Sequence, residues 1–171
     1  MPACMLMIKN KMLKVCEVYM ANRLTGKLVL LTGGVANIGL YILEYLVEEG
    51  GKVAIVDIYS VRGSQVEQRF PGVVKFFRAD LSKESDISAV VVQAADWMGG
   101  INTLCLNAGI QLSGNVENFT AEAWDKVFAI NVRANFVFIR ESLVCLREAK
   151  KSSVVLMSSL AGKRGAPGLT C

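Results

Sequence analysis

Residues 27–39, with the sequence KLVLLTGGVANIG, constrain the fold of this chain more than any other stretch. Residues 28–31 are all apolar, which is typical of a strand covered on both faces of a parallel sheet. Gly33 and Gly34 have no Cβ, so the backbone can turn tightly there and approach a ligand closely. A helix that begins after Asn37 would direct its free N–H groups and its positive dipole end toward the space above the turn, where a pyrophosphate commonly binds.

An acidic residue follows at the spacing that a dinucleotide site requires. Asp57 ends the next apolar run, residues 53–56, and lies 18 residues after Gly39. In dinucleotide-binding folds an acid roughly 20 residues beyond the glycine turn binds the adenosine ribose. A glycine-rich turn alone can be a plain connection between strand and helix, but strand, turn, helix, strand and acid in this order favour a dinucleotide site.

Apolar periodicity predicts alternating strands and helices from residue 22 onward. Such alternation implies right-handed crossovers, so we predict an α/β fold with a doubly wound parallel sheet of the Rossmann type. Residues 1–21 are expected to form a poorly ordered extension with a weak amphipathic helix pattern between Leu6 and Tyr19, and residues 22–171 one dinucleotide-binding domain. Strands are expected at about residues 27–32, 52–57, 73–78, 102–106 and 153–157, and helices at about 38–49, 61–70, 83–98 and 120–149.

The sequence also predicts three local features. Ser82 is expected to cap the helix that follows it. The helix at 38–49 places an apolar set on one side, which consists of Ile38, Ile42, Tyr45 and Leu46. The aromatic side chains of Trp97, Trp124, Phe128 and Phe136 are assigned to the core.

Composition excludes several classes of function. The net charge of +4 is scattered and forms no basic stripe with interleaved aromatic residues, so we expect no nucleic-acid partner. No apolar run reaches the 18 or more residues of a membrane helix. The five cysteines show no paired spacing, which favours free thiols in a reducing, cytoplasmic compartment. Histidine is absent, and we expect no metal site.

Polar or glycine residues follow the predicted strands. Because ligands of such sheets bind outside the carboxyl ends of the strands, these residues should lie around one site. They are Gly33, Asp57, Asp80, Asn107 and Ser159.

These motifs, in this order, resemble those of the short-chain dehydrogenase/reductase family from about residue 22 to residue 171. Residues 32–39, TGGVANIG, are similar to the family's TGxxxGxG turn, and Asp80-Leu81 to the pair that contacts adenine. Residues 107–109, Asn-Ala-Gly, look like the motif that borders the cofactor, and Ser158-Ser159 like the serine pair in which the second serine is catalytic. The resemblance assigns cofactor binding to Gly33, Gly34, Asn37, Ile38, Gly39, Asp57, Asp80, Leu81, Asn107, Ala108 and Gly109, and catalysis to Ser159 and Asn131.

The resemblance implies an oxidoreductase that transfers hydride between a small alcohol or ketone and a nicotinamide cofactor. Asp57 implies NAD in preference to NADP, and the full-length form is expected to be a homo-oligomer. By the family's spacing, the catalytic tyrosine and lysine would follow Cys171, so we expect a chain cut short of them, with little turnover and an uncovered apolar edge at residues 154–157. The alternative is a non-catalytic dinucleotide-binding or regulatory module, whereas the motifs argue against a methyltransferase.

One departure from the family pattern concerns the glycine turn itself. The family's middle glycine is Asn37 here. Asparagine tolerates a left-handed backbone and can cap a helix. Its side chain is expected to crowd the cofactor and to weaken binding without abolishing it.

Overall fold

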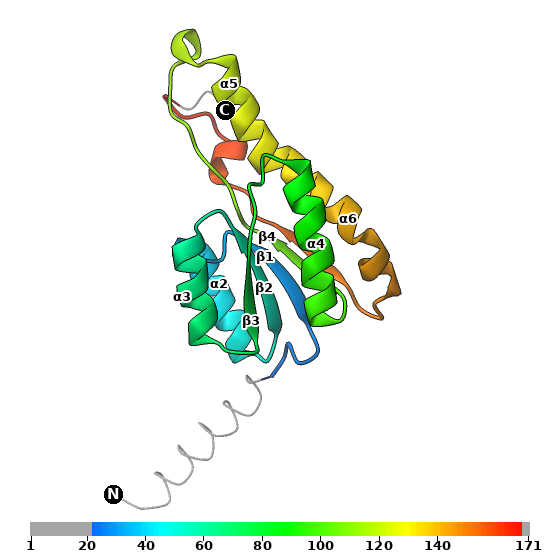
Figure 1. The fold of residues 1–171 in the computed structure, drawn as a ribbon. Helices are drawn as coiled ribbons and strands as arrows, with labels where there is room; N and C mark the ends of the chain where they lie inside the picture. Colours follow the sequence, from blue (N-terminus) through cyan, green and yellow to red (C-terminus); the bar gives the residue numbers. More distant parts are fainter. Residues whose placement is uncertain (1–21, 169–171) are drawn as a thin grey trace, which may run out of the picture.

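A five-stranded parallel sheet with helices on both faces makes up the described part of the chain, residues 22–168 of a computed structural model (Figure 1). Expectations for residues 1–21 and 169–171 lie outside the described residues. The strand order is β3-β2-β1-β4-β5, and each neighbouring pair is parallel. This confirms the predicted α/β, Rossmann-like class.

The elements follow one another as strand and helix along the chain. In order they are β1 (Leu28–Thr32), α2 (Asn37–Glu48), β2 (Lys52–Asp57), α3 (Ser60–Arg69), β3 (Val74–Arg78), α4 (Glu84–Met98), β4 (Thr103–Leu106), α5 (Ala121–Phe128), α6 (Ala134–Glu148) and β5 (Ser153–Leu156). Short 3-10 turns occupy Val116–Asn118 and Leu160–Gly162, and a π-helical turn, Ala129–Arg133, joins α5 to α6.

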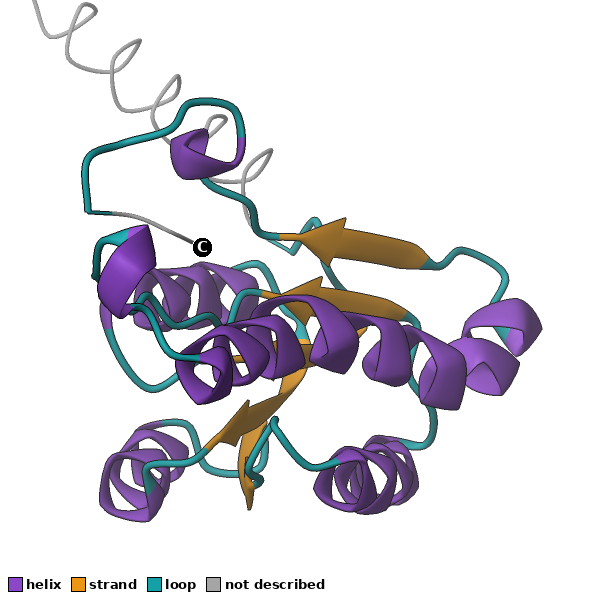
Figure 2. Ribbon diagram, turned by 90° about the horizontal axis from the view of Figure 1, so that it is seen from above, coloured by secondary structure: helices purple, strands orange, loops and turns teal. Residues whose placement is uncertain are grey.

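Alternation along β1 and β2 divides the core between the two faces of the sheet. Leu30 and Val56 face α4 and α6, and their cluster includes Ile87 of α4 and Phe138 of α6. Val29, Leu31, Val53 and Ile55 face α2 and α3, where they pack with Leu43 and Val66. Figure 2 shows this arrangement from above, with the sheet between two layers of helices. Burial on both faces explains the unbroken apolar runs in the two strands.

The sheet order reverses next to β1, whose neighbours are β2 on one side and β4 on the other. The chain leaves β1 toward β2 through α2 and reaches β4 only after α4. The helices that follow β1 and β4 therefore diverge, which opens a crevice above the carboxyl ends of these strands. The candidate site lies there.

The structure corrects two local expectations. Ser82 does not cap α4: the N-cap is Lys83, which makes no side-chain cap bond, while the Ser82 backbone and hydroxyl donate to Asp80. Three aromatic residues assigned to the core are substantially exposed, namely Trp124, Phe128 and Phe136. Trp124 and Phe128 stack on each other with ring centroids 4.7 Å apart. The core assignment of Trp124 and Phe128 was wrong because helical spacing places both rings on one side of α5 but does not show whether that side is buried.

The long helix expected at 120–149 is interrupted. Thr120 caps α5 by accepting a hydrogen bond from the Ala123 N–H, as its side chain allows. The chain then widens into the π-helical turn before α6 begins. Such single π turns are rare and often mark functional positions. None of the helices between residues 22 and 168 combines the length and the apolar character that crossing a bilayer demands.

Candidate dinucleotide site

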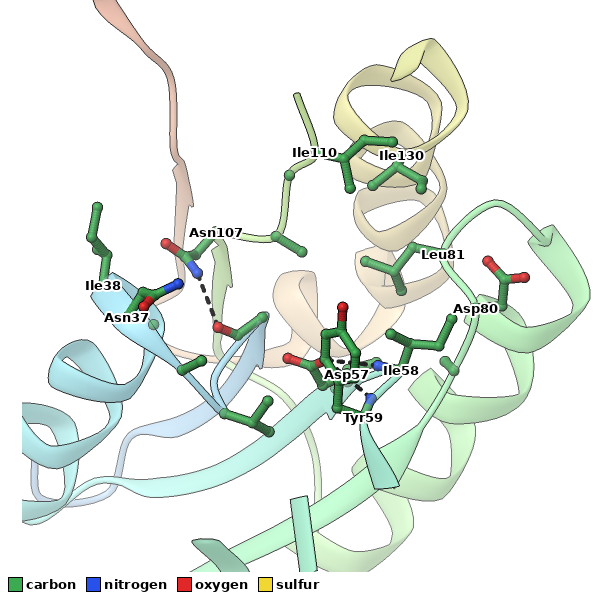
Figure 3. A pocket seen from close by; sticks show the side chains of 18 residues that line it. Asn37, Ile38, Asp57, Ile58, Tyr59, Asp80, Leu81, Asn107, Ile110 and Ile130 are labelled. Atoms are coloured by element: carbon green, nitrogen blue, oxygen red, sulfur yellow. Dashed lines mark hydrogen bonds between the residues drawn. The ribbon is translucent and has the colours of Figure 1, made fainter. Parts of the chain in front are cut away.

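A cavity of about 420 Å³ lies above the carboxyl ends of β1, β2 and β4 (Figure 3). The structure brings together most of the predicted cofactor residues here, although they come from distant parts of the chain. Those that line the cavity are Gly33, Asn37, Ile38, Gly39, Asp57, Asp80, Leu81, Asn107, Ala108 and Gly109.

The turn between β1 and α2 depends on glycine at two positions. Gly33 has a left-handed φ of 69°, and a Cβ on it would lie 3.0 Å from Ala108 Cα. A Cβ on Gly39 would lie 1.8 Å from the Gly33 carbonyl oxygen, which no side chain permits. The first turn of α2 therefore packs directly on the end of β1. This close approach leaves the N-terminal amides of α2 at the cavity wall, where an anion can accept from them.

Gly34 serves packing beneath the turn. It is absent from the cavity lining among the described residues, and a Cβ on it would lie 2.8 Å from Ile55 Cγ2 and 3.0 Å from Leu31 Cδ2. Its predicted contact with the cofactor stays a prediction.

Asn37 adopts the left-handed backbone expected of it, with φ 49°. It does not cap α2, because it is the first helical residue and Ala36 is the N-cap without a side-chain bond. Figure 3 shows its side chain at the cavity beside Ile38. The amide therefore occupies space that a glycine would leave empty.

Asp57 stands at the end of β2 and shapes the chain that follows. Its Oδ1 accepts hydrogen bonds from the N–H groups of Ile58 and Tyr59, at 2.8 Å and 3.2 Å. Both bonds use the same oxygen and fix the carboxylate at the cavity, where Tyr59 lies next to it in Figure 3. Two neighbouring hydroxyls of a ribose are suitable donors to such a carboxylate.

Asp80 follows β3 and organises the turn before α4. Its Oδ1 accepts from the Ser82 N–H at 3.0 Å and from the Ser82 hydroxyl at 2.7 Å. These bonds, with smaller contributions from Lys83 and Lys126, lower the pKa of the Asp80 carboxyl below its ordinary value. The carboxylate is therefore ionised at neutral pH while the adjacent Leu81 lines the cavity.

Asn107 and Thr32 join the ends of β4 and β1. The Asn107 Nδ2 donates to the carbonyl oxygens of Thr32 and Gly33, both at 3.2 Å. In return the buried Thr32 hydroxyl accepts from the N–H groups of Asn107 and Ala108 at 3.0 Å. These four bonds hold the glycine turn against the loop after β4, so the cavity floor is fixed before any ligand binds.

Asn131 lies in the π-helical turn, and its side chain hydrogen-bonds to the loop after β4. Its Oδ1 accepts from the Ile110 N–H at 2.9 Å, and its Nδ2 donates to the Ile110 carbonyl at 2.8 Å. The Asn131 carbonyl accepts in turn from Asn135 Nδ2 at 2.8 Å. The side chain thus makes one donated and one accepted bond to the backbone of Ile110, which lines the cavity, whereas Asn131 itself does not line it.

Ser159 follows β5 and is exposed, outside the cavity lining. Its Oγ accepts from the Ala161 N–H at 3.2 Å and so caps the short 3-10 turn. The structure does not bring Ser159 and Asn131 into the cavity with the other predicted residues. Their catalytic roles stay predictions.

Sequence reasoning missed several apolar or aromatic wall residues, which are Val35, Ala36, Val56, Ile58, Tyr59, Ala79, Ile110 and Ile130. All but Tyr59 are direct chain neighbours of a predicted site residue, so extending each predicted position by one residue on each side would have included them. Among residues 22–168, no group of three or more His, Cys, Asp or Glu side chains is placed to hold a metal ion.

Comparisons with known proteins agree with this geometry. Residues 27–171 match the short chain dehydrogenase family. A 2-(S)-hydroxypropyl-CoM dehydrogenase 3 of Xanthobacter autotrophicus is 36% identical over 86% of this chain and 59% of its own length. A 3-beta-hydroxysteroid dehydrogenase of Comamonas testosteroni is 33% identical over 83% of this chain and 56% of its own. An NADP-dependent (R)-specific alcohol dehydrogenase of Lentilactobacillus kefiri is 33% identical over 88% of this chain and 61% of its own.

A solved short-chain dehydrogenase/reductase of the glucose/ribitol dehydrogenase type from Brucella melitensis superimposes with a TM-score of 0.82 at 26% identity, over 88% of this chain and 64% of that one. The chain thus spans less than two thirds of the length of these relatives. Fold and site define a Rossmann-type protein with a crevice at the reversal point of its sheet. The chain belongs to the short-chain dehydrogenase/reductase family.

Proposed function

We propose that this chain is the cofactor-binding part of an oxidoreductase that transfers hydride between a small alcohol or carbonyl substrate and a nicotinamide dinucleotide. The cavity at the ends of β1, β2 and β4 carries this proposal, because a glycine turn, a helix N-terminus and two carboxylates converge on it. When bound, the nicotinamide ring supplies the hydride acceptor or donor. The names of the similar dehydrogenases support the reaction class.

The residues present fit such a dinucleotide. The diphosphate would rest on the amides that open α2, since neither Gly33 nor Gly39 carries a Cβ there. Asp57 would accept from the ribose hydroxyls through Oδ2, since its Oδ1 already accepts from two backbone N–H groups. Asp80 and Leu81 would border the adenine.

NAD is the proposed cofactor in preference to NADP. A 2′-phosphate beside the Asp57 carboxylate would meet a like charge, which disfavours NADP. An Asp57→Ser variant should therefore lose affinity for NAD and gain relative affinity for NADP. Titration calorimetry of the unmodified chain and of Asp57→Ser with both cofactors tests this, and an unchanged ratio of the NAD and NADP affinities would contradict the role of Asp57.

Catalytic roles follow from the family resemblance. Ser159 would hydrogen-bond the substrate oxygen, and Asn131 would take part in the proton relay. In the family the general base is a tyrosine, and removing a general base typically lowers a rate by about 10²–10⁴-fold. The tyrosine in the cavity wall, Tyr59, lies beside Asp57 in Figure 3, whereas Ser159 lies outside the cavity lining. We therefore expect residues 1–171 on their own to bind the cofactor with little turnover.

A second candidate is a non-catalytic dinucleotide-binding or regulatory module. Two observations favour it: the Asn131 side chain bonds to the backbone of Ile110, and Ser159 lies outside the cavity lining. Calorimetry with NAD and NADH is paired with a test of alcohol-dependent NADH formation. Turnover above background supports the enzyme and excludes the module, binding without turnover is the result that both candidates predict for residues 1–171, and the absence of binding overturns both.

We also propose that the protein works in a reducing, cytoplasmic compartment. The support is chemical: Cys105 and Cys145 are both free thiols in the described part of the chain. Burial also raises the pKa of the Cys105 thiol, which keeps it protonated and unreactive.

A further inference from the structure

The outer edge of β3 has backbone groups that take no part in the sheet. Within residues 22–168, β3 pairs with β2 on one side, and no strand pairs with its other side. The Val53 N–H donates to the Val73 carbonyl at 2.9 Å, and the Ala79 N–H donates to the Asp57 carbonyl at 3.1 Å, so alternate residues of β3 bond to β2. The residues whose backbone groups point outward are therefore Val74, Phe76 and Arg78.

The neighbouring helix, α3, accepts hydrogen bonds from two of these outward N–H groups. The Val74 N–H donates at 3.0 Å to the carbonyl of Phe70, the residue that follows α3. The Phe76 N–H, in the middle of the strand, donates to Glu67 Oε2 at 3.0 Å. The Glu67 carboxylate thus occupies the position at which the carbonyl oxygen of a further strand would accept.

We propose that Glu67 closes the β3 edge against pairing with β5 of a second copy of this chain. A strand added at this edge would need the Phe76 N–H as a donor, and that N–H already bonds to the carboxylate. Open strand edges are templates for pairing with other chains, and proteins prevent such pairing by covering the edge. The proposal concerns association alone and does not depend on cofactor binding.

The packing of α3 holds Glu67 in this position. Gly63 lies directly on Phe76, because a Cβ at Gly63 would be 2.3 Å from Cδ2 of the Phe76 ring. Gly63 and Glu67 are four residues apart and so lie on the same side of the helix. At the last residue of α3, Arg69 pairs with Glu44 of α2 at 2.6 Å. The bond from Glu67 to β3 is therefore part of a helix face that packs on the strand.

The two edges of the sheet consequently differ. β5 pairs with β4 on one side, and its other side is open in the described part of the chain, whereas α3 covers the edge of β3. Copies with one open edge can pair only through the same edge of each, which gives closed pairs. Two different open edges on one copy give head-to-tail contacts that repeat without closing. Glu67 therefore limits association through the sheet to pairs of chains.

Sedimentation of the full 171-residue chain over a concentration series, together with amide exchange at the edge, tests the proposal. In the unmodified chain the Phe76 amide should exchange slowly and association should stop at pairs. Glu67→Ala removes the acceptor, so the Phe76 amide should exchange about tenfold faster or more, and the mean mass should rise beyond that of a pair. Adding Leu156→Lys places a charge in β5 and should return the mass to that of a pair or less.

Two variants separate the hydrogen bond from the charge of the side chain. Glu67→Gln keeps an oxygen acceptor in the same place without the charge and should behave like the unmodified chain. Glu48→Ala removes the same charge from an exposed position of α2 and should also behave like the unmodified chain. If Glu67→Ala loses amide protection in β1 and β4, Glu67→Leu takes its place, with Glu48→Leu as its control, because leucine keeps most of the bulk of the side chain.

Four results would overturn the proposal, each read while the amides of β1 and β4 stay protected. The first is fast exchange of the Phe76 amide, or growth beyond pairs, in the unmodified chain. The second is association of Glu67→Ala that does not exceed that of the unmodified chain. The third is equal growth in Glu67→Gln or Glu48→Ala, which would assign the effect to charge. The fourth is growth that survives Leu156→Lys, which would exclude β5 of a second copy as the partner.

Discussion

At the scale of single residues, Gly39 is the least replaceable position in the site. A Cβ there would lie 1.8 Å from the Gly33 carbonyl oxygen, so Gly39→Ala must push α2 away from β1. We expect a loss of about 3 kcal/mol or more in the free energy of unfolding, at the upper end of overpacking effects, together with loss of NAD binding. Urea unfolding and calorimetry measure the two. Gly165→Ala is the control, because a Cβ at Gly165 meets nothing within 4 Å, and equal losses in both variants would contradict the steric explanation.

A substitution at Asn37 should change NAD affinity with little effect on the free energy of unfolding. Glycine at a left-handed position relieves about 1 kcal/mol of strain but makes the unfolded chain more flexible by a similar amount. Asn37→Gly should therefore change stability by less than about 1 kcal/mol while NAD binds about fivefold more tightly, which corresponds to about 1 kcal/mol.

Asn22 supplies the control for Asn37. It is the other left-handed asparagine among residues 22–168, with φ 72°, and it lies outside the cavity lining. Asn22→Gly should reproduce the stability change and leave NAD affinity unaltered. If NAD affinity does not rise in Asn37→Gly, the amide does not crowd the cofactor.

Asp80 links the site to pH. Hydrogen bonds from Ser82 lower the pKa of its carboxyl below the ordinary 3.8, so the folded protein holds this proton less strongly than the unfolded chain does. The resulting stabilisation is complete above the unfolded pKa and is lost as pH falls through the lower native pKa.

Ser82→Ala should therefore raise the pKa of Asp80 toward its ordinary value and flatten the acid limb of the stability curve below about pH 4. A carboxyl NMR titration and urea unfolding at several pH values measure this. Ser85→Ala, at an exposed serine in the first turn of α4, is the control. An unchanged Asp80 titration in Ser82→Ala would contradict the assigned cause.

At the scale of elements, the sequence predicted those features of strands and helices that depend on neighbouring residues in the chain. The predicted ends of the strands and the C-terminal ends of α2 and α4 were accurate. Apolar runs determine the strand ends locally, and the left-handed Gly50 and Gly99 end the two helices. Helical spacing likewise marks the buried side of α4, which consists of Ile87, Val90, Val91, Ala94 and Met98, with Ala95 partly buried.

Features that depend on tertiary contact were not predictable in the same way. The Asn131 side chain bonds to Ile110, which is 21 residues distant in the sequence, and the helical pattern of residues 120–149 contains no sign of the π turn that places it. Likewise, periodicity placed Ile38, Ile42, Tyr45 and Leu46 on one side of α2 but could not show that Ile38 and Tyr45 remain exposed there. The cofactor residues were found because strand ends meet at one edge of the sheet, whereas Ser159 caps a turn beyond the cavity.

Through Asn131, the π-helical turn between α5 and α6 is hydrogen-bonded to Ile110 in the loop after β4. Asn131→Ala removes both bonds to Ile110 and should lower the free energy of unfolding by about 1–3 kcal/mol, because two backbone groups lose their partner. The Ile110 amide should exchange faster. Asn131→Asp keeps the acceptor for the Ile110 N–H and should recover part of that protection. Asn115→Ala, at an exposed asparagine of the same loop, should have little effect.

At the scale of the whole molecule, β5 is an open edge of the sheet. It pairs with β4 on one side, and within residues 22–168 no strand pairs with its other side. Val154, Val155, Leu156 and Met157 are between 41% and 53% exposed, which confirms the expected uncovered apolar edge. Unpaired backbone groups beside apolar side chains favour pairing with another chain, so we expect residues 1–171 to associate as concentration rises.

Leu156→Lys should suppress this association, because a charged side chain in an edge strand opposes pairing. Sedimentation at several concentrations measures it, with NAD present and absent so that cofactor binding is not mistaken for the cause. Val116→Lys is the matched control, because Val116 is 71% exposed and lies in the 3-10 turn after β4, outside the strands of the sheet. If the unmodified chain stays monomeric at every concentration, or if both lysine variants weaken association equally, the edge of β5 is not where chains meet.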